Sequence, residues 1–188
     1  MLDRAIAVDE KFIKFVNSKV LNKNLKYKEK LLPFSELELL RYFDSQVKSR
    51  LIDILARQLK EKGQSFYTIG SSGHEGNVIF GSVFPSTDLA FLHYRSGAFF
   101  IERAKQLQNF DGANEILLSL VASREDKISA GRHKVFGSVD LNIPPQTSTI
   151  ASHLPKALGA AISVTRAKEL ELPAKLKKDG IVLCSFGD

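Results

Sequence analysis

The sequence predicts an α/β protein with a parallel sheet covered by helices on both faces. Two short apolar runs, at residues 89–93 and 180–186, have the length of buried strands, and helical segments separate them. The chain has 188 residues and a formal net charge of +6, and this length suits one domain of ordinary size. Its single cysteine, Cys184, excludes an internal disulfide and fits a reducing compartment.

Composition excludes several classes of protein. The chain is 44% hydrophobic and 26% charged, as is typical of a globular protein. No uninterrupted apolar run approaches the roughly 18 residues of a membrane helix, and charges between Asp3 and Lys14 interrupt any signal-peptide core. We therefore expect a cytoplasmic protein without a membrane partner.

The amino-terminal lysines raise the alternative of nucleic-acid binding. Seven lysines lie between Lys11 and Lys30, with Phe12, Phe15 and Tyr27 among them. The phenylalanines fall on the apolar face of a predicted helix, where core packing explains them, and no nucleic-acid-binding motif is present. We therefore expect no nucleic-acid partner, and steeply salt-dependent binding would contradict this expectation.

The first elements are predicted to be helices. An amphipathic pattern covers residues 5–20, and a basic connector follows. The second helix begins at Ser35, because Ser35 and Glu38 have capping-box spacing, and Gly63 is a suitable stop. Between them apolar residues recur at three- and four-residue steps, as on the apolar face of a helix: Leu37, Leu40, Val47, Leu51, Ile54, Leu55 and Leu59.

A glycine-rich stretch, Gly70–Gly76, is predicted to lead into a helix through Phe80 or beyond. Ser72 and Glu75 repeat the capping-box spacing at this point. We then expect a turn at residues 85–88 and a strand at 89–93. Two helices follow at 97–109 and 112–123, and a loop-rich segment covers 124–149.

The last elements are a helix over residues 152–170 and the strand 180–186. Pro155 is tolerated in the first turn of this helix. Gly159 costs about 1 kcal/mol relative to alanine and so suggests close packing against another backbone. Because only two or three strands are expected and the last ends the sequence, we expect an incomplete piece of a larger α/β unit, or one with its missing strands elsewhere.

Two strand ends carry residues suited to an anionic ligand. Tyr94 and Arg95 follow the first apolar run, and Gly187 and Asp188 follow the last. Ligands of open α/β sheets bind at the carboxyl ends of strands, arginine suits phosphate, and Mg²⁺ is held by carboxylates together with ligand phosphates. These pairs are candidate parts of a metal–diphosphate site; a surface arginine and an ordinary Gly-Asp turn are the alternatives.

The four histidines are His74, His93, His133 and His153, and none has zinc-motif spacing. His93 lies on an apolar run and is interpreted as a core or near-core residue. His133 lies in a cationic loop, residues 131–134, that suits an anionic substrate or an acidic protein surface, or is simply solvated. The sequence contains no phosphate loop, dinucleotide fingerprint or nucleophile elbow.

Three segments resemble the alpha part of thiamine diphosphate-dependent 2-oxo acid dehydrogenases. These are the decarboxylating first components of the pyruvate and branched-chain 2-oxo acid dehydrogenase complexes. The segments are Gly131–Ser138, Pro145–Gly159 and Val182–Asp188, and they look closest to bacterial forms with fused alpha and beta parts. The resemblance covers residues 35–188 and implies the amino-terminal portion of a thiamine diphosphate-binding fold there, with residues 1–34 as a helical extension.

The resemblance implies roles for four residues around the cofactor. Tyr94 and Arg95 match the family's Tyr-Arg pair at the cofactor diphosphate. Ser148 and Ile150 match the segment whose backbone lies against the aminopyrimidine ring.

The resemblance also implies a metal ligand and a catalytic residue. Gly187 and Asp188 match the opening of the cofactor motif, with Asp188 as a Mg²⁺ ligand, and His133 stands for the family's active-site loop histidine in a shorter loop. The motif's downstream Asn and the catalytic Glu of the beta part lie outside these 188 residues.

The implied activity is oxidative decarboxylation of a small 2-oxo acid, pyruvate or a branched-chain one, with thiamine diphosphate and Mg²⁺ as cofactors. The acyl group then passes to the lipoyl group of an acyltransferase component. The resemblance implies an oligomer that includes the beta part, and this chain alone is expected to be inactive. The alternative is a non-catalytic fragment or degenerate homologue that only binds a partner.

Overall fold

The computed structural model describes residues 4–18, 33–68, 70–132, 135–147, 149–171 and 179–187. The described residues form a mixed α/β structure with two small sheets. Chain contacts divide it into two compact units, Met1–Leu39 and Leu40–Asp188, which we describe separately. None of the described helices is long and apolar enough to cross a bilayer.

The first unit contains α1 (Arg4–Ser18) and the start of α2 (Glu36–Glu61). The predicted capping box is confirmed. Ser35 N donates to Glu38 Oε2 over 2.7 Å, and Glu38 N donates to Ser35 Oγ over 3.3 Å. Two amide donors at the helix start are thereby satisfied.

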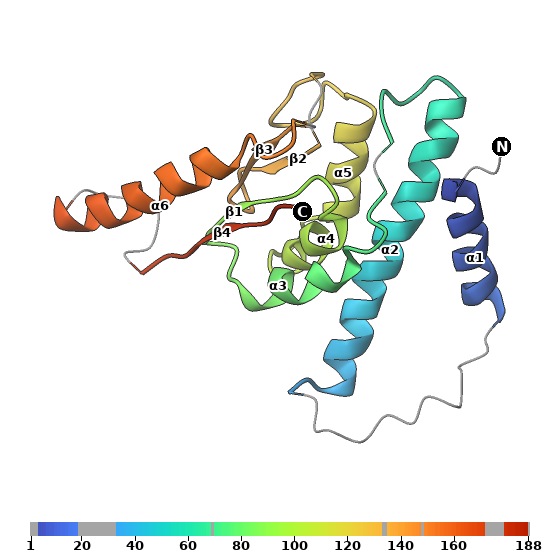
Figure 1. Cartoon of the computed structure of the whole chain (residues 1–188), viewed down its shortest axis with the longest axis horizontal. Coiled ribbons are helices and arrows are strands. Elements are labelled where there is room, and N and C mark those ends of the chain that lie inside the picture. The colour runs from blue at the N-terminus through green and yellow to red at the C-terminus, as the bar shows by residue number, and fades with distance from the viewer. Residues whose placement is uncertain are drawn as a thin grey trace. The chain divides into compact units, whose positions relative to one another are not determined.

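The second unit contains the rest of α2 and every later element (Figure 1). They are η1 (Glu75–Asn77), α3 (Val78–Val83), β1 (Leu89–Phe91), α4 (Gly97–Ala104), α5 (Gly112–Leu120), β2 (Phe136–Ser138), β3 (Ile143–Gln146), α6 (Leu154–Glu169) and β4 (Val182–Cys184). α2 stops where predicted, because Gly63 adopts a φ of +69° and Gln64 N donates to Leu59 O.

The buried face of α2 is not the apolar one that the periodicity indicates. Leu40, Leu51 and Leu55 are exposed. The buried positions are instead mostly small or polar, at Tyr42, Ser45, Ser49, Arg50, Asp53 and Ala56. They share one helical face because they recur at three- and four-residue steps, and their polar groups find long-range partners in later elements.

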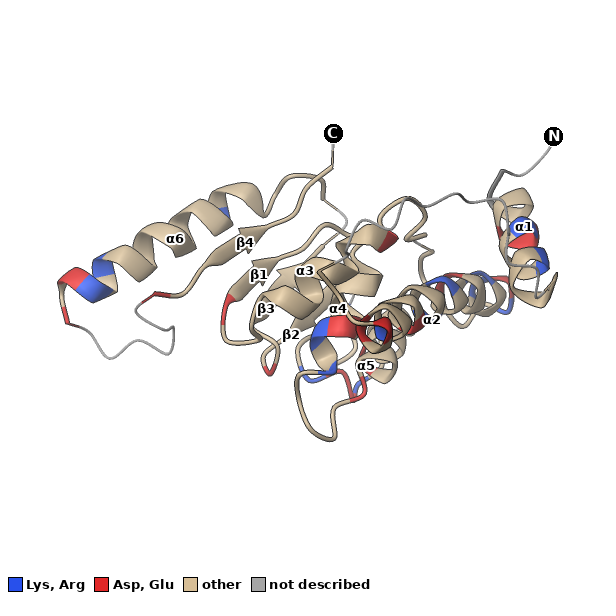
Figure 2. Ribbon diagram, turned by 90° about the horizontal axis from the view of Figure 1, so that it is seen from below, with Lys and Arg blue, Asp and Glu red and all other residues tan. Residues whose placement is uncertain are grey.

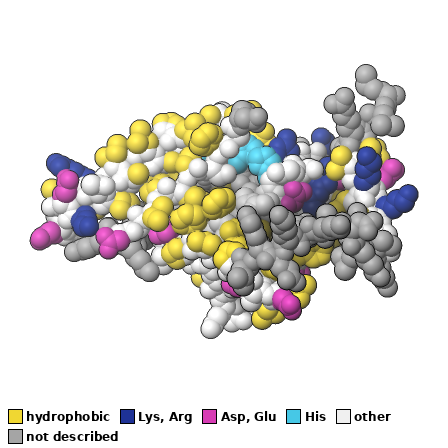
Figure 3. All heavy atoms as spheres, turned by 60° about the horizontal axis from the view of Figure 1, so that its bottom comes forward, with side chains coloured by type: hydrophobic (Ala, Val, Ile, Leu, Met, Phe, Trp, Pro, Cys, Tyr) yellow, Lys and Arg dark blue, Asp and Glu magenta, His cyan; other side chains and the backbone are white. Residues whose placement is uncertain are grey.

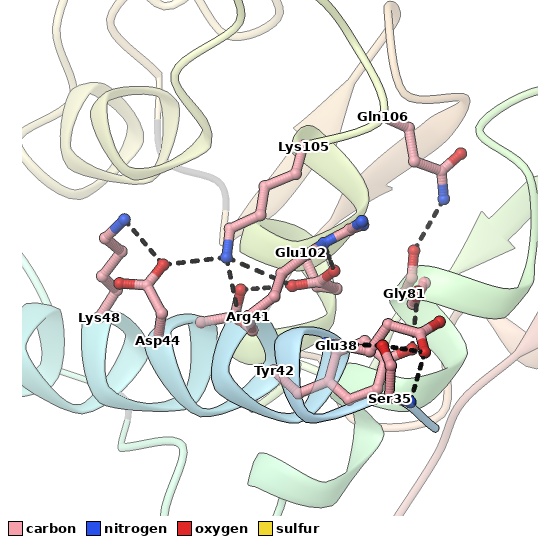
Figure 4. Close-up of polar contacts among 12 residues, drawn as sticks. Ser35, Glu38, Arg41, Tyr42, Asp44, Lys48, Gly81, Glu102, Lys105 and Gln106 are labelled. Atoms are coloured by element: carbon pink, nitrogen blue, oxygen red, sulfur yellow. Dashed lines mark hydrogen bonds and ion pairs between the residues drawn. The ribbon is translucent and has the colours of Figure 1, made fainter. Parts of the chain in front are cut away.

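One set of these partners ties α2 to α4 (Figure 4). The Glu102 carboxylate is fully buried, accepts a hydrogen bond from Ser45 Oγ at 2.6 Å and pairs with Arg41 Nε at 2.5 Å. Lys105 Nζ bridges the two helices at the surface, 2.9 Å from Asp44 Oδ2. A buried carboxylate satisfied in this way fixes how α4 lies along α2.

The hydrophobic core lies between α4, α5, β1 and the β2–β3 hairpin. Its fully or nearly fully buried members include Ala90, Leu92, Phe99, Phe100, Ile101, Ala104, Ile116, Val135, Phe136, Leu141 and Ile143. The antiparallel β2–β3 pair lies within residues 124–149, which the sequence predicts to be loop-rich without strands, so that prediction is wrong at these two strands. Two prolines inside β3 conceal that strand from a pattern-based prediction.

The loop before α3 and the helix α6 also differ from expectation. Glu75 Oε2 accepts from Gly73 N, and the predicted Ser72 cap is wrong, since His74 is the cap residue of η1. In α6, Pro155 does lie in the first turn. Gly159, however, has no described heavy atom within 4 Å of an added Cβ, so its predicted close packing is wrong.

The two predicted strands pair with each other in parallel. β1 and β4 run side by side with Leu89 opposite Val182 and Phe91 opposite Cys184 (Figures 1 and 2). β4 is half-buried rather than buried as predicted, and α6 lies beside it. The ribbon of α6 is uncharged over most of its length in Figure 2, with charges gathered at its carboxyl end.

Candidate functional site

The parallel pairing brings the two predicted strand ends together. Tyr94 and Arg95 follow β1, and Gly187 follows β4, its hydrogen-bonded neighbour. The pairing continues one step past the strands, because Ser185 N donates to Phe91 O over 2.8 Å. The carboxyl ends of both strands therefore form one edge, as ligand sites of parallel sheets require.

The turn from β1 into α4 fixes Tyr94 and Arg95. Ser96 N donates to His93 O over 3.0 Å, and Phe100 N donates to Ser96 O, so α4 starts immediately after the turn. Gly97 is the first residue of α4. An added Cβ there would lie 2.5 Å from Ser49 Oγ of α2, so the close contact between the two helices favours glycine at this position. The strand, the turn and the helix are thus locked into one unit.

Arg95 is held in a defined direction. Its NH1 donates to Gly70 O over 2.5 Å, and its guanidinium carbon lies 5.1 Å from the centre of the Tyr94 ring. One end of the glycine-rich loop is therefore attached to the end of β1. A planar cation partly saturated in this way still offers donors to a phosphate oxygen.

Three histidines meet at the same edge. The His93 ring is 5% exposed, stacks on His74 with ring centres 4.9 Å apart, and lies 4.0 Å from the Tyr94 ring. Burial, followed by the charges of His74, Arg95 and His153, lowers the pKa of His93. Histidine side chains form one cyan patch on the face drawn in Figure 3.

The tautomer of His93 follows from its contacts. Nδ1 accepts a hydrogen bond from Arg95 N over 3.3 Å, so the neutral ring carries its hydrogen on Nε2. Nε2 faces Gly187, where an added Cβ would lie only 3.1 Å away. The glycine lets the chain leaving β4 pass directly over this ring.

The segment before α6 reaches the same edge through His153. Its Nε2 lies 2.7 Å from Ser185 O, and the ring is 3% exposed. Ile150, three residues earlier, is 71% exposed and therefore accessible to a ligand. The ends of β1 and β4 carry Arg95 and Gly187, and His153 attaches to them the segment that contains Ile150.

A buried layer supports the edge from α2. Asp53 Oδ2 accepts from Ser71 N, from Ser71 Oγ and from Arg50 NH1, each over 2.8 Å. Burial raises the pKa of Asp53, and the Ser71 hydrogen bonds and the Arg50 charge oppose it. Ser49 Oγ also donates to Ser71 Oγ over 3.0 Å. These contacts hold the glycine-rich loop against α2.

A small cavity lies beneath Tyr94 and Arg95. It measures about 40 Å³ and is walled by Asp53, Ser71 and Phe136 among others. Because a buried water needs roughly 10–15 Å³, this volume has room for a few waters but not for an organic ligand. This cavity is therefore too small to be the ligand site itself.

Several predicted site residues lie outside the part of the chain that the structure describes. They are His133, Ser148 and Asp188. Within the described part, no three His, Cys, Asp or Glu side chains are arranged to hold a metal ion. Sequence reasoning missed the grouping of His74 and His153 with His93, because residues this far apart give no local pattern.

No protein-family model matches the chain.

Proposed function

We propose that this chain supplies the alpha-type half of a thiamine diphosphate site in a 2-oxo acid dehydrogenase. The observation that carries the proposal is the parallel pairing of β1 with β4. It places Tyr94 and Arg95 beside Gly187, as a diphosphate anchored at two strand ends needs. The resemblance of the sequence to the alpha part of this family assigns the same residues to the cofactor.

The described residues fit the cofactor's chemistry. Arg95 supplies a cation whose direction is set by Gly70 O, and the Tyr94 ring lies beside it. Gly187 lets the main chain after β4 lie close against the His93 ring, and exposed Ile150 offers an apolar contact to an aromatic ring. Asp188 would ligate Mg²⁺ next to the diphosphate.

When bound, thiamine diphosphate supplies the nucleophilic carbon and the electron sink for decarboxylation of a 2-oxo acid. The chain's own contribution is to bind and orient the cofactor. Arg95 neutralises the diphosphate charge, and neutral His93 keeps its proton on Nε2 at the side of Gly187. The cationic loop at residues 131–134, with His133, would meet the carboxylate of the substrate or the incoming lipoyl domain.

The proposal includes the partners of such an enzyme. The beta part would complete the site with its catalytic Glu, and the lipoyl-bearing acyltransferase component would accept the acyl group. The substrate would be pyruvate or a branched-chain 2-oxo acid. A cytoplasmic oligomer is part of the same proposal.

The test is release of CO₂ from 2-oxo acids by the chain assembled with its beta part, with ferricyanide as electron acceptor. We expect release to require both thiamine diphosphate and Mg²⁺. Arg95→Ala should raise the cofactor concentration needed for half-maximal rate by about 10- to 150-fold, the loss of one charged hydrogen bond. Arg166→Ala is the control, because that arginine is exposed and forms a surface ion pair with Glu169 on α6.

Failure of the folded, assembled protein to release CO₂ from either kind of 2-oxo acid would reject the proposal. A chain that then still binds the beta part would instead be a partner-binding module. An Arg95→Ala variant with unchanged cofactor dependence would remove Arg95 from the diphosphate site.

A further inference from the structure

We propose that His153 is a positioning residue, which clamps the end of β4 and so sets where the main chain at Gly187 meets a bound diphosphate. The ligand in this inference rests on the function proposed above, but the clamp itself rests on contacts. His153 immediately precedes α6, whereas Ser185 immediately follows β4. One side chain therefore joins two segments that are 32 residues apart in sequence.

The contact between His153 and Ser185 has a defined direction. The Ser185 carbonyl can only accept, so His153 Nε2 must be the donor at 2.7 Å. The ring is 3% exposed, and water has little access to replace this bond. Ser185 is partly buried, so without this donor its carbonyl would be partly shielded from water and unsatisfied, which makes loss of the bond unfavourable.

The clamp holds Ser185 through both of its backbone groups. Its N–H donates to Phe91 O of β1 over 2.8 Å, while its C=O accepts from His153. Two residues later the chain passes over the His93 ring at Gly187. The path of the chain beyond β4 is therefore determined by β1, by the start of α6 and by His93 together.

The His153 ring does not serve its own helix. Its backbone carbonyl accepts the first helical bond from Ala157 N at 2.9 Å, but its side chain makes no capping hydrogen bond to the helix amides. Residues at this position ordinarily cap the helix with a side-chain oxygen. The donor of His153 is directed at β4 instead, which is the observation that separates a clamp from a helix cap.

The clamp also connects two parts of the proposed site. Ile150 lies three residues before His153, and Gly187 lies two residues after Ser185. The hydrogen bond between His153 and Ser185 therefore helps to set the separation of the two segments that would contact the ring end and the diphosphate end of the cofactor. Loss of the bond should therefore weaken cofactor binding more than it slows turnover at saturating cofactor.

The experiment compares wild type, His153→Leu and His153→Gln in the chain assembled with its beta part. Leucine fills the volume without a donor, and glutamine restores an amide N–H. Hydrogen exchange is read at residues 180–187 and, as internal reference, at residues 97–104 of α4. Thiamine diphosphate with Mg²⁺ is titrated in parallel, and the maximal rate is measured at saturating cofactor.

We expect His153→Leu to speed hydrogen exchange at residues 180–187 by about five- to tenfold, which is the effect of losing one hydrogen bond, with exchange in α4 unchanged. The dissociation constant of thiamine diphosphate should rise by a similar factor, and His153→Gln should reverse most of both effects. Unchanged exchange at 180–187 in His153→Leu would overturn the clamp. Equal acceleration in α4 would also overturn it, because it would indicate general destabilisation.

The outcomes separate this inference from the proposed function. If wild type binds no thiamine diphosphate but the exchange results hold, the clamp stands and the proposed function falls. If the cofactor binds and His153→Leu leaves its affinity unchanged, the positioning role is refuted. Should His153→Leu fail to fold, His153→Asn, whose shorter amide reaches less far, takes its place with the same expected directions.

Discussion

Replacement of Gly187 by alanine tests the close approach of β4's end to His93. A Cβ built at Gly187 lies 3.1 Å from His93 Nε2 and 3.7 Å from Cδ2 and Cε1. Because non-bonded heavy atoms pack best at roughly 3.5–4.0 Å, the ring or the chain must move by about half an ångström. The ring is held by His74 at 4.9 Å, by Tyr94 at 4.0 Å and by Arg95 N at 3.3 Å.

The expected cost of Gly187→Ala follows from this confinement. Overpacking of a confined site costs about 1–3 kcal/mol. For a chain of this size each kcal/mol lowers Tm by about 2–4 °C, so Tm should fall by about 2–12 °C. Gly159→Ala is the matched control: its Cβ meets no described atom, and alanine in a helix interior should stabilise by about 0.5–1 kcal/mol.

The assay is thermal and urea unfolding of wild type, Gly187→Ala, His93→Ala and the double variant. Removing the ring makes room for the methyl group, so the double variant should lose less stability than the two single changes together, by about 1 kcal/mol or more. If the two losses simply add, or if Gly187→Ala behaves like Gly159→Ala, the close contact between Gly187 and His93 does not exist.

Three further outcomes follow from buried charged and titratable groups. Asp53→Asn removes the nearer of two carboxylates that pair with buried Arg50, since Glu75 is 3.7 Å away, so the free energy of unfolding should fall by about 3 kcal/mol in urea unfolding. A loss below about 1 kcal/mol would contradict the pairing. Burial lowers the pKa of His93 below its ordinary 6.5, so just below that pH the unfolded chain binds a proton at His93 that the native protein does not bind. The free energy of unfolding should therefore fall as pH drops below about 6.5. His93→Gln should flatten that part of the curve of stability against pH. Glu102→Gln should destabilise the protein by about 2–4 kcal/mol in thermal unfolding, because Glu102 is buried and pairs with Arg41. Asp44→Asn, which breaks the more exposed pair with Lys105, should change stability by less than about 1 kcal/mol. Equal effects would contradict the burial of Glu102.

Local signals predicted much of the fold. Ser35, Glu38 and Gly63 bound α2 because caps and stops depend on neighbouring residues alone. The same periodicity did not identify the buried face of α2, since Ser45 and Asp53 are buried by partners far away in sequence. Hydrophobic patterning is a poor guide where polar groups are satisfied by long-range hydrogen bonds.

The candidate site was predicted in part. Arg95 and Gly187 each follow an apolar run, and the general behaviour of parallel sheets predicts that such ends are neighbours, as β1 and β4 are. The histidine grouping was not predictable, because the contact of His93 with His74 and that of His153 with Ser185 depend on tertiary packing. The cofactor roles of these residues stay predictions.

Calorimetric titration of thiamine diphosphate with Mg²⁺ tests the central claim most directly. The ligand is added to the chain alone and to the chain together with its beta part. We predict binding in the combined sample, with loss of affinity in Arg95→Ala and none in Arg166→Ala. Absence of binding in the combined sample, from protein shown to be folded and assembled, would rule out a thiamine diphosphate site shared with the beta part and favour a partner-binding module.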